Sequence, residues 1–250
     1  MADDESKVFL ITGASTGIGA ATARLAVAAG HRVVLAARSA DRLDALASEL
    51  GGDERAIAVA TDVTDWPQQQ ALAARALKHF GGLDVVFANA GGGEFATLQD
   101  ETPQHLADTL NRNVGGTVFT LQAVLPFLNE GASIVLAGST AAYAGVPAFG
   151  AYAASKAAIR SLGRTWAAEL VDRKIRVNTV VPGPVETPGL RGLAPSDQQQ
   201  ALLDGEAASV PMGRVGRPDE IASAVVFLAS DQSSFMTGAE MFVDGGSRQL

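Results

Sequence analysis

Residues 7–19 read Lys-Val-Phe-Leu-Ile-Thr-Gly-Ala-Ser-Thr-Gly-Ile-Gly, and this stretch decides the fold of the chain. Its first six residues form a short β-branched and aromatic run, which predicts a strand. Gly13, Gly17 and Gly19 follow, and the alanine-rich residues 20–29 then favour a helix. Glycines let the backbone turn tightly, so that the free N–H groups of the helix N-terminus can face a pyrophosphate. The segment predicts a dinucleotide-binding turn, with the spacing G-x-x-x-G-x-G.

Strand and helix patterns alternate along the rest of the chain. Strands are expected near 7–12, 32–37, 56–60, 84–88, 132–137, 175–181 and 240–243, and helices near 18–29, 41–50, 67–80, 103–128, 150–172 and 218–229. This alternation predicts an α/β protein with a doubly wound Rossmann fold, a seven-stranded, mostly parallel sheet and helices on both faces. Ligands of such folds bind at the carboxyl ends of the strands.

Tyr152 and Lys156 form the most suggestive pair of side chains. A spacing of four residues places both on one face of the helix expected at 150–172. A nearby ammonium favours the phenolate and lowers the pKa of a tyrosine, which would suit Tyr152 to proton transfer. A solvated Tyr beside a surface Lys is the alternative reading of the pair alone.

Two further polar residues stand before this pair. Ser139 ends the run Ser-Ile-Val-Leu-Ala-Gly-Ser, where a buried strand would reach a ligand site. Asn113 falls inside the expected helix 103–128, where its amide could hold water. Taken singly, the serine could be a helix cap and the asparagine a surface amide.

With these motifs the chain resembles the short-chain dehydrogenase/reductase family, specifically its single-domain branch of roughly 250 residues. The family's TGxxxGxG motif matches residues 12–19, and its Asp-Val, Asn-Ala-Gly and Pro-Gly motifs match 62–63, 89–91 and 182–183. Its Val-Asp-Gly-Gly motif matches 243–246. One departure is Ala88, where many relatives carry a second Asn.

The resemblance implies the roles of individual residues. The catalytic set is Asn113, Ser139, Tyr152 and Lys156, and no metal is expected. The cofactor-binding set is Gly13, Ser15, Thr16, Gly17, Ile18, Gly19, Arg38, Ser39, Asp62, Val63, Asn89, Ala90, Gly91, Tyr152, Lys156, Pro182, Gly183, Val185 and Thr187.

The implied reaction is hydride transfer between a nicotinamide cofactor and a carbonyl or alcohol carbon. Ser139 and Tyr152 would bind the substrate oxygen, and Tyr152 would be the general acid in reduction and the base in oxidation. Lys156 would lower the pKa of Tyr152 and bind the nicotinamide ribose, and Asn113 would hold a relay water. The function expected is an NAD(P)H-dependent oxidoreductase that converts a ketone to a secondary alcohol, or the reverse.

Arg38 bears on the choice of cofactor. An NAD site places an acid after the second strand to bind the ribose hydroxyls, but here Ala37, Arg38 and Ser39 stand at this point. A guanidinium suits the 2′-phosphate of NADPH, which is therefore favoured. Thr16 stands where many NADP-using relatives have a cation, so NADH stays possible.

Substrate specificity is expected from three segments. Residues 91–95, residues 141–149 and a binding loop or lid at 187–211 should line the pocket. Phe95, Tyr143, Val146, Phe149 and Leu190 suggest a mainly apolar lining, with Glu94 and Arg191 as candidate polar contacts.

Composition agrees with one soluble cytoplasmic domain over residues 1–250. The hydrophobic content is 47%, there is no cysteine, and the formal charge of −8 argues against nucleic-acid binding. The start is too acidic for a signal peptide, and no apolar run is long enough to span a membrane. His31, His79 and His105 lie far apart in the sequence and are expected near the surface.

Three alternative functions need weighing, together with the oligomeric state. A 3-oxoacyl-[acyl-carrier-protein] reductase would need a basic patch for its acidic carrier, and Arg173, Lys174 and Arg176 are the densest candidates. An extended-branch epimerase would need a larger C-terminal domain. A non-catalytic dinucleotide-sensing protein could lose Tyr152 or Lys156. The resemblance also implies a homotetramer, formed through the helix at 150–172 and the C-terminal tail.

Overall fold

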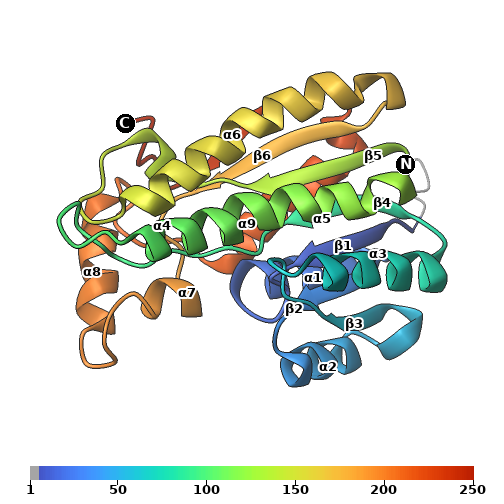
Figure 1. The fold of residues 1–250 in the computed structure, drawn as a ribbon, viewed down its shortest axis with the longest axis horizontal. Helices are drawn as coiled ribbons and strands as arrows, with labels where there is room; N and C mark the ends of the chain where they lie inside the picture. The colour runs from blue at the N-terminus through green and yellow to red at the C-terminus, as the bar shows by residue number, and fades with distance from the viewer. Residues whose placement is uncertain (1–5) are drawn as a thin grey trace.

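One parallel sheet organises the protein in this computed structural model, which describes residues 6–250 (Figure 1). The strand order is β3-β2-β1-β4-β5-β6-β7, so the chain winds outward from β1 in both directions. The strands are β1 (Val8–Thr12), β2 (Arg32–Ala37), β3 (Ala56–Ala60), β4 (Leu83–Ala88), β5 (Leu128–Ala137), β6 (Arg176–Pro182) and β7 (Glu240–Val243). The predicted doubly wound Rossmann fold is confirmed, and all strand pairs among these residues are parallel.

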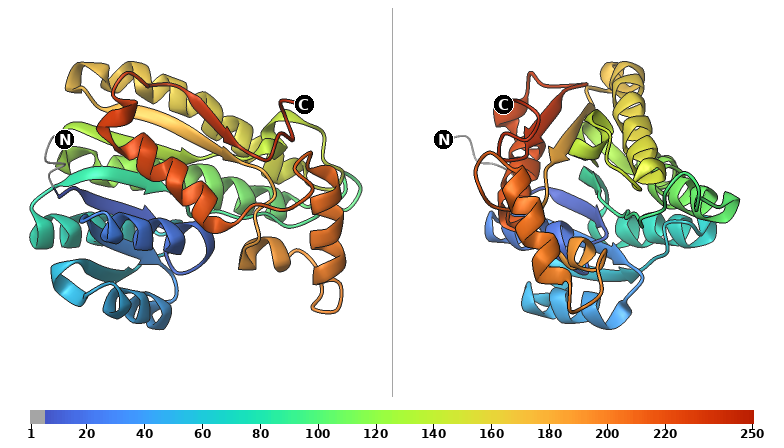
Figure 2. Two further views of the ribbon diagram at one scale, coloured as in Figure 1. Left: turned by 180° about the vertical axis from the view of Figure 1, so that it is seen from behind. Right: turned by 90° about the vertical axis from the view of Figure 1, so that its left-hand side faces the viewer.

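Helices cover both faces of the sheet. Figure 2 shows α1 (Gly17–Ala28), α2 (Ala40–Glu49) and α9 (Pro218–Ala229) together on one face. The other face carries α3 (Trp66–Phe80), α4 (Pro103–Leu110), α5 (Gly116–Val124) and α6 (Gly150–Leu170). Two further helices, α7 (Pro188–Arg191) and α8 (Gln199–Ser209), stand to one side of the sheet (Figure 1). Short 3₁₀ turns occupy Gly52–Glu54, Leu125–Phe127, Thr140–Tyr143, Val171–Arg173 and Asp231–Ser233.

The inner strands β1, β2, β4 and β6 are buried on both faces, which explains their mainly apolar sequence. Side chains alternate between faces along β1: Val8 and Leu10 join the core under α3, α5 and α6, whereas Phe9 and Ile11 join the core under α1, α2 and α9. These two cores hold the sheet between its helical layers and fix the strand ends that carry the motifs.

The helix expected at 103–128 is divided. A π-helical turn, Asn111–Gly115, separates α4 from α5, and a 3₁₀ turn follows α5. The fifth strand starts at Leu128, four residues before the predicted start at 132. A π turn shifts the helix phase locally, and such turns occur often at functional sites.

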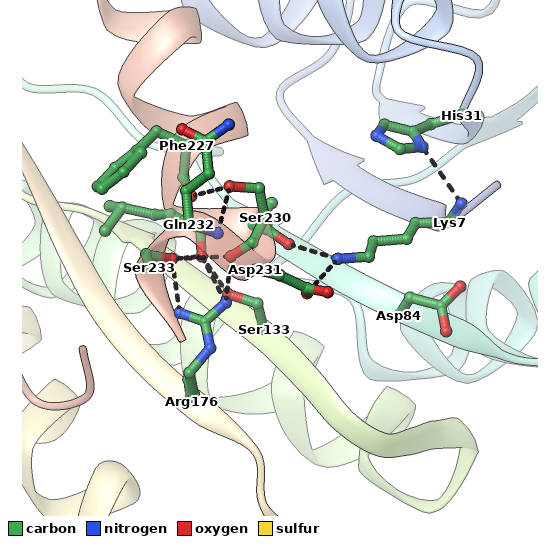
Figure 3. A network of polar contacts seen from close by, with 12 residues as sticks. Lys7, His31, Asp84, Ser133, Arg176, Phe227, Ser230, Asp231, Gln232 and Ser233 are labelled. Atoms are coloured by element: carbon green, nitrogen blue, oxygen red, sulfur yellow. Dashed lines mark hydrogen bonds and ion pairs between the residues drawn. The ribbon is translucent and has the colours of Figure 1, made fainter. Parts of the chain in front are cut away.

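Arg176, at the start of β6, organises a polar network at the amino ends of the strands (Figure 3). Its guanidinium donates to the carbonyl oxygens of Leu228 and Ser230 at 2.9 and 3.2 Å and to the Ser233 hydroxyl at 2.9 Å. These bonds satisfy carbonyls that the end of α9 leaves free. The network ties α9 to the sheet at the edge away from the predicted ligand site.

One expectation about the histidines is wrong, because His31 is buried. Its ring stacks on Phe9 at 5.2 Å and accepts a hydrogen bond from the backbone N–H of Lys7. Among residues 6–250 there is no cluster of His, Cys, Asp or Glu able to hold a metal. Nor does this part of the chain contain a helix of the length and apolarity needed to cross a membrane. Residues 1–5, on which the signal-peptide argument rests, lie outside the described residues.

Candidate active site

A cleft of about 960 Å³ opens at the carboxyl ends of the strands. The glycine turn after β1, the ends of β2 to β6, the first turns of α6 and the segment from β6 to α8 all contribute to its wall. Every residue of the predicted cofactor-binding set lies on this wall except Gly19. Of the predicted catalytic set, Ser139, Tyr152 and Lys156 line the cleft, whereas Asn113 lies behind it.

The glycine turn has the backbone that its sequence predicts. Gly13 and Gly17 adopt φ values of +66° and +54°, which side-chain-bearing residues rarely adopt. A side chain on Gly19 would collide with the carbonyl oxygen of Gly13. Gly19 therefore packs the helix against the turn, which explains its absence from the wall.

Asn89 joins the ends of β1 and β4 behind this turn. Its side-chain amide donates to the Thr12 carbonyl at 3.0 Å, and the Thr12 hydroxyl accepts from the backbone N–H groups of Asn89 and Ala90, both at 3.0 Å. The turn is thus held rigidly although position 88 carries Ala and not a second Asn.

The N-terminus of α1 fits a pyrophosphate. Thr16 is its N-cap residue but makes no side-chain capping bond, and residues 15–18 line the cleft. Uncapped N–H groups and the positive end of the helix dipole form an anion-binding site. This end of the protein therefore suits a dinucleotide.

Positive charge gathers farther along the cleft, beyond β2. Arg38, Arg42 and Arg112 lie on its wall with Asp62. Hydrogen bonds from the backbone and hydroxyl of Thr64, at 2.9 and 2.7 Å, lower the pKa of Asp62, and the two cations Arg38 and Arg112 lower it further. The Asp62 carboxylate is therefore ionised, and the cations outnumber it. Arg42 was not predicted; it lies in the first turn of α2, four residues after Arg38.

The catalytic candidates meet where α6 passes the end of β5. The Lys156 ammonium lies 5.6 Å from the centre of the Tyr152 ring and donates to the Ala137 carbonyl at 2.9 Å. Burial lowers the pKa of Lys156 to about 8, because removal of water disfavours the charged form. Phe149 stacks on Tyr152 with ring centres 4.4 Å apart and limits the movement of the phenol.

The pKa of Tyr152 departs from expectation. Burial raises it, and a hydrogen bond with the Ser139 hydroxyl acts in the opposite direction. Loss of hydration around the phenol outweighs the Ser139 hydrogen bond, so the lowering expected from Lys156 is not observed. A protonated Tyr152 is the form needed for a general acid.

Asn113 occupies the π turn and is 1% exposed. Its side-chain amide donates to the Gly92 carbonyl at 2.9 Å and to the Ser155 hydroxyl at 2.8 Å, and its side-chain oxygen accepts from the Gly92 N–H at 2.9 Å. Both of its N–H groups are therefore engaged by protein. Asn113 clamps the loop after β4 onto α6, and a relay water would have to donate to one of its oxygens.

Four of the five residues predicted to form an apolar substrate pocket line the cleft. Phe95, Val146, Phe149 and Leu190 line it. Tyr143 does not: its hydroxyl binds Glu240. Its ring packs 4.9 Å from that of Phe242, away from the cleft.

The two charges suggested for substrate contact are also paired elsewhere. Glu94 lies 3.7 Å from Arg112, and Arg191 binds Glu186. Neither lines the cleft. The lining residues that the sequence did not indicate include Leu193, Glu206, Ser247 and Arg248. Only the lid prediction at 187–211, which covers Leu193 and Glu206, gave a signal for any of them.

Comparison with known proteins gives the family. Residues 13–248 match a family model described as enoyl-(acyl carrier protein) reductase. The chain is 37% identical over 245 residues to 3-oxoacyl-[acyl-carrier-protein] reductase FabG of Thermotoga maritima, covering 97% of this chain and 98% of FabG. It is 38% identical over 250 residues to cis-4-hydroxycyclohexanecarboxylate dehydrogenase of Sinomonas cyclohexanicum, covering 96% of each.

A solved structure agrees in fold and length. A Brucella melitensis protein titled short-chain dehydrogenase/reductase SDR:Glucose/ribitol dehydrogenase superposes with a TM-score of 0.92 at 33% identity over 100% of both chains. The chain belongs to the short-chain dehydrogenase/reductase family. It is an NAD(P)-dependent oxidoreductase of ketones and alcohols.

Proposed function

We propose that this protein reduces a ketone of modest size to a secondary alcohol with NADPH, Tyr152 being the general acid. The observation that carries the proposal is the meeting of Ser139, Tyr152 and Lys156 in one cleft with an uncapped helix N-terminus and a cluster of arginines. The same arrangement would serve the reverse oxidation, with Tyr152 as base.

The positions of these residues suggest a role for each of them in the reaction. Ser139 and Tyr152 donate hydrogen bonds to the substrate oxygen and stabilise the negative charge that develops there. The bound nicotinamide supplies a hydride. Tyr152 gives its proton to the oxygen, and the adjacent ammonium of Lys156 stabilises the phenolate that remains. Asn113 keeps the loop at Gly92 in place beside the reacting groups.

NADPH is favoured because Arg38 and Arg42 lie at the end of the cleft beyond β2, and Arg38, not an acid, directly follows that strand. Arg38 makes no hydrogen bond or ion pair within residues 6–250, so its guanidinium is available to a phosphate. Val185 and Thr187 would hold the nicotinamide end. Residues 187–211, which contain α7 and α8, would form the lid of a single domain.

A cofactor-coupled screen tests this function. Wild-type protein is mixed with NADPH or NADH and a panel of cyclic and open-chain ketones, and absorbance of the reduced cofactor is followed. We expect oxidation of NADPH that depends on the ketone and exceeds the rate with NADH. A protein that binds NADPH but neither oxidises it with any ketone nor reduces NADP⁺ with the corresponding alcohols would instead be the dinucleotide sensor.

Reduction of 3-oxoacyl-[acyl-carrier-protein] is the second candidate, suggested by the similarity to FabG. The basic residues expected to dock the carrier do not support it. Arg173 binds the carbonyls of Leu125 and Leu128, Lys174 pairs with Glu130, and Arg176 is engaged by α9. Arg173 and Lys174 precede β6 and Arg176 is its first residue, so all three lie at the opposite end of the sheet from the cleft. A pull-down with acyl carrier protein distinguishes this candidate.

The proposal also covers the binding partner, the oligomeric state and the location of the protein. A small molecule is the expected partner, and a homotetramer and a cytoplasmic location remain predictions. Sedimentation velocity measures the oligomeric state directly. Residues 6–250 form one seven-stranded sheet, and the second substrate domain that an extended-branch epimerase needs is not found among them.

A further inference from the structure

Glu206 is an acid whose position the proposed reaction does not use. It lies on α8 and lines the cleft together with Ser209, Leu190 and Leu193. Within residues 6–250 its carboxylate makes no hydrogen bond or ion pair; the nearby Ser209 hydroxyl binds only the backbone carbonyl of Glu206. Other acids of the neighbouring segments are paired, as Glu186 is with Arg191 and Glu220 with Arg214.

The surroundings of Glu206 make this lack of a partner notable. The substrate end of the cleft is otherwise mainly apolar, with Phe95, Val146 and Phe149 on its wall. Burial raises the pKa of Glu206 because the carboxylate has lost part of its water. A carboxylate that is partly desolvated without a protein partner is unfavourable, so a ligand that supplies the missing donor would be bound preferentially.

We propose that Glu206 binds a hydroxyl or ammonium group that the substrate carries apart from its reacting carbonyl. The inference rests on the proposed ketone reduction and adds the substrate class: a ketone with a second, hydrogen-bond-donating group. Glu206 also discriminates against ketones with a carboxylate at that place, because two carboxylates would repel each other.

Arg248 also lines the cleft, and its positive charge could favour an anionic substrate. Its side chain is exposed, so hydration weakens its attraction for anions, and no ion pair joins it to Glu206 within residues 6–250. Glu206 is the more buried of the two and therefore dominates the selection.

The test compares four ketones that differ in one substituent: 4-hydroxy-, 4-amino- and 4-methylcyclohexanone and 4-oxocyclohexanecarboxylate. For wild type, we expect kcat/KM for the hydroxy and amino ketones to exceed that for the methyl ketone. In Glu206→Gln, the amino ketone should lose about tenfold or more, and the carboxylate ketone should gain relative to the methyl ketone. Asp204→Asn is the matched control, because Asp204 lies on the same helix, exposed and outside the cleft lining.

Binding gives a second readout that does not depend on turnover. Calorimetric titration of 4-aminocyclohexanol into the NADP⁺ complex should show weaker binding in Glu206→Gln and unchanged binding in Asp204→Asn. Equal changes for all four ketones, or a wild-type preference for the carboxylate ketone, would overturn the role of Glu206 while ketone reduction still stands. Wild type that reduces neither these four ketones nor any ketone of the wider panel removes the proposed function and this inference together.

Discussion

Lys156 shows how a single buried charge links stability to chemistry. Only 5% of this residue is exposed, and its ammonium donates to one carbonyl, that of Ala137. Its pKa of about 8 means that the folded protein holds a charge that its interior disfavours. Such a cost is tolerated where the charge has a task, here beside the Tyr152 phenol.

The pH dependence of stability measures this cost. Below pH 8 the folded state carries the buried ammonium, and from pH 8 toward 10.5 the unfolded state binds more protons, so wild-type stability should rise with pH. Relative to Lys156→Met, the free energy of unfolding of wild type should increase by about 2 kcal/mol between pH 8 and 9.5. Urea denaturation at both pH values is the measurement. Lys78→Met, at an exposed position of α3, serves as control and should show no such trend.

We predict that Arg38 sets the choice of cofactor through its attraction to a 2′-phosphate. Arg38→Ala should weaken NADPH binding by roughly 1.5–3 kcal/mol, or about ten- to a hundredfold, and leave NADH binding almost unchanged. Ala37→Asp should go further and reverse the preference, since an acid repels the 2′-phosphate and accepts the ribose hydroxyls. Binding constants for both cofactors test this; equal weakening of both by Arg38→Ala would make Arg38 a stacking or surface residue.

The π turn between α4 and α5 is the element on which the site geometry depends most. It places Asn113 so that one amide holds Gly92 and Ser155 at once. An unbroken helix over these residues would rotate Asn113 away from one of the two partners, because each residue advances the helix phase by a fixed angle.

Removal of this clamp should affect both folding and catalysis. Asn113→Ala leaves the Gly92 backbone groups and the Ser155 hydroxyl without their partner, so we expect a loss of about 1–3 kcal/mol in unfolding free energy and a lower kcat. Asn111→Ala, on the exposed side of the same turn, should leave stability within about 0.5 kcal/mol of wild type. Similar destabilisation by both changes would contradict the clamp.

The strands and the glycine turn could be predicted from the sequence, because each has a pattern that is complete within a few consecutive residues. The strands carry continuous apolar runs because both of their faces are buried, and the glycine turn carries the positive φ values that its sequence requires. The π turn was not predicted because its change of one hydrogen-bond register is confined to Asn111–Gly115, too short a segment to show in the hydrophobic periodicity.

At the scale of the whole molecule, the sheet topology brings the distant motifs together. Residues from Gly13 to Thr187 reach one cleft because parallel strands end at the same edge. Contacts made by side chains from separate segments were not predictable in this way. Tyr143 follows the same strand as Ser139 but turns toward Glu240 on β7, and Glu206 reaches the cleft only through the fold of α8.

Turnover of Tyr152→Phe with NADPH and the best ketone of the screen tests the central claim most directly. The change keeps the ring that packs on Phe149 and removes the proton that reduction requires. We expect kcat/KM to fall by at least about a thousandfold while the dissociation constant of NADPH stays within about threefold of wild type. Near-normal turnover in this variant would contradict the assignment of Tyr152 as the general acid.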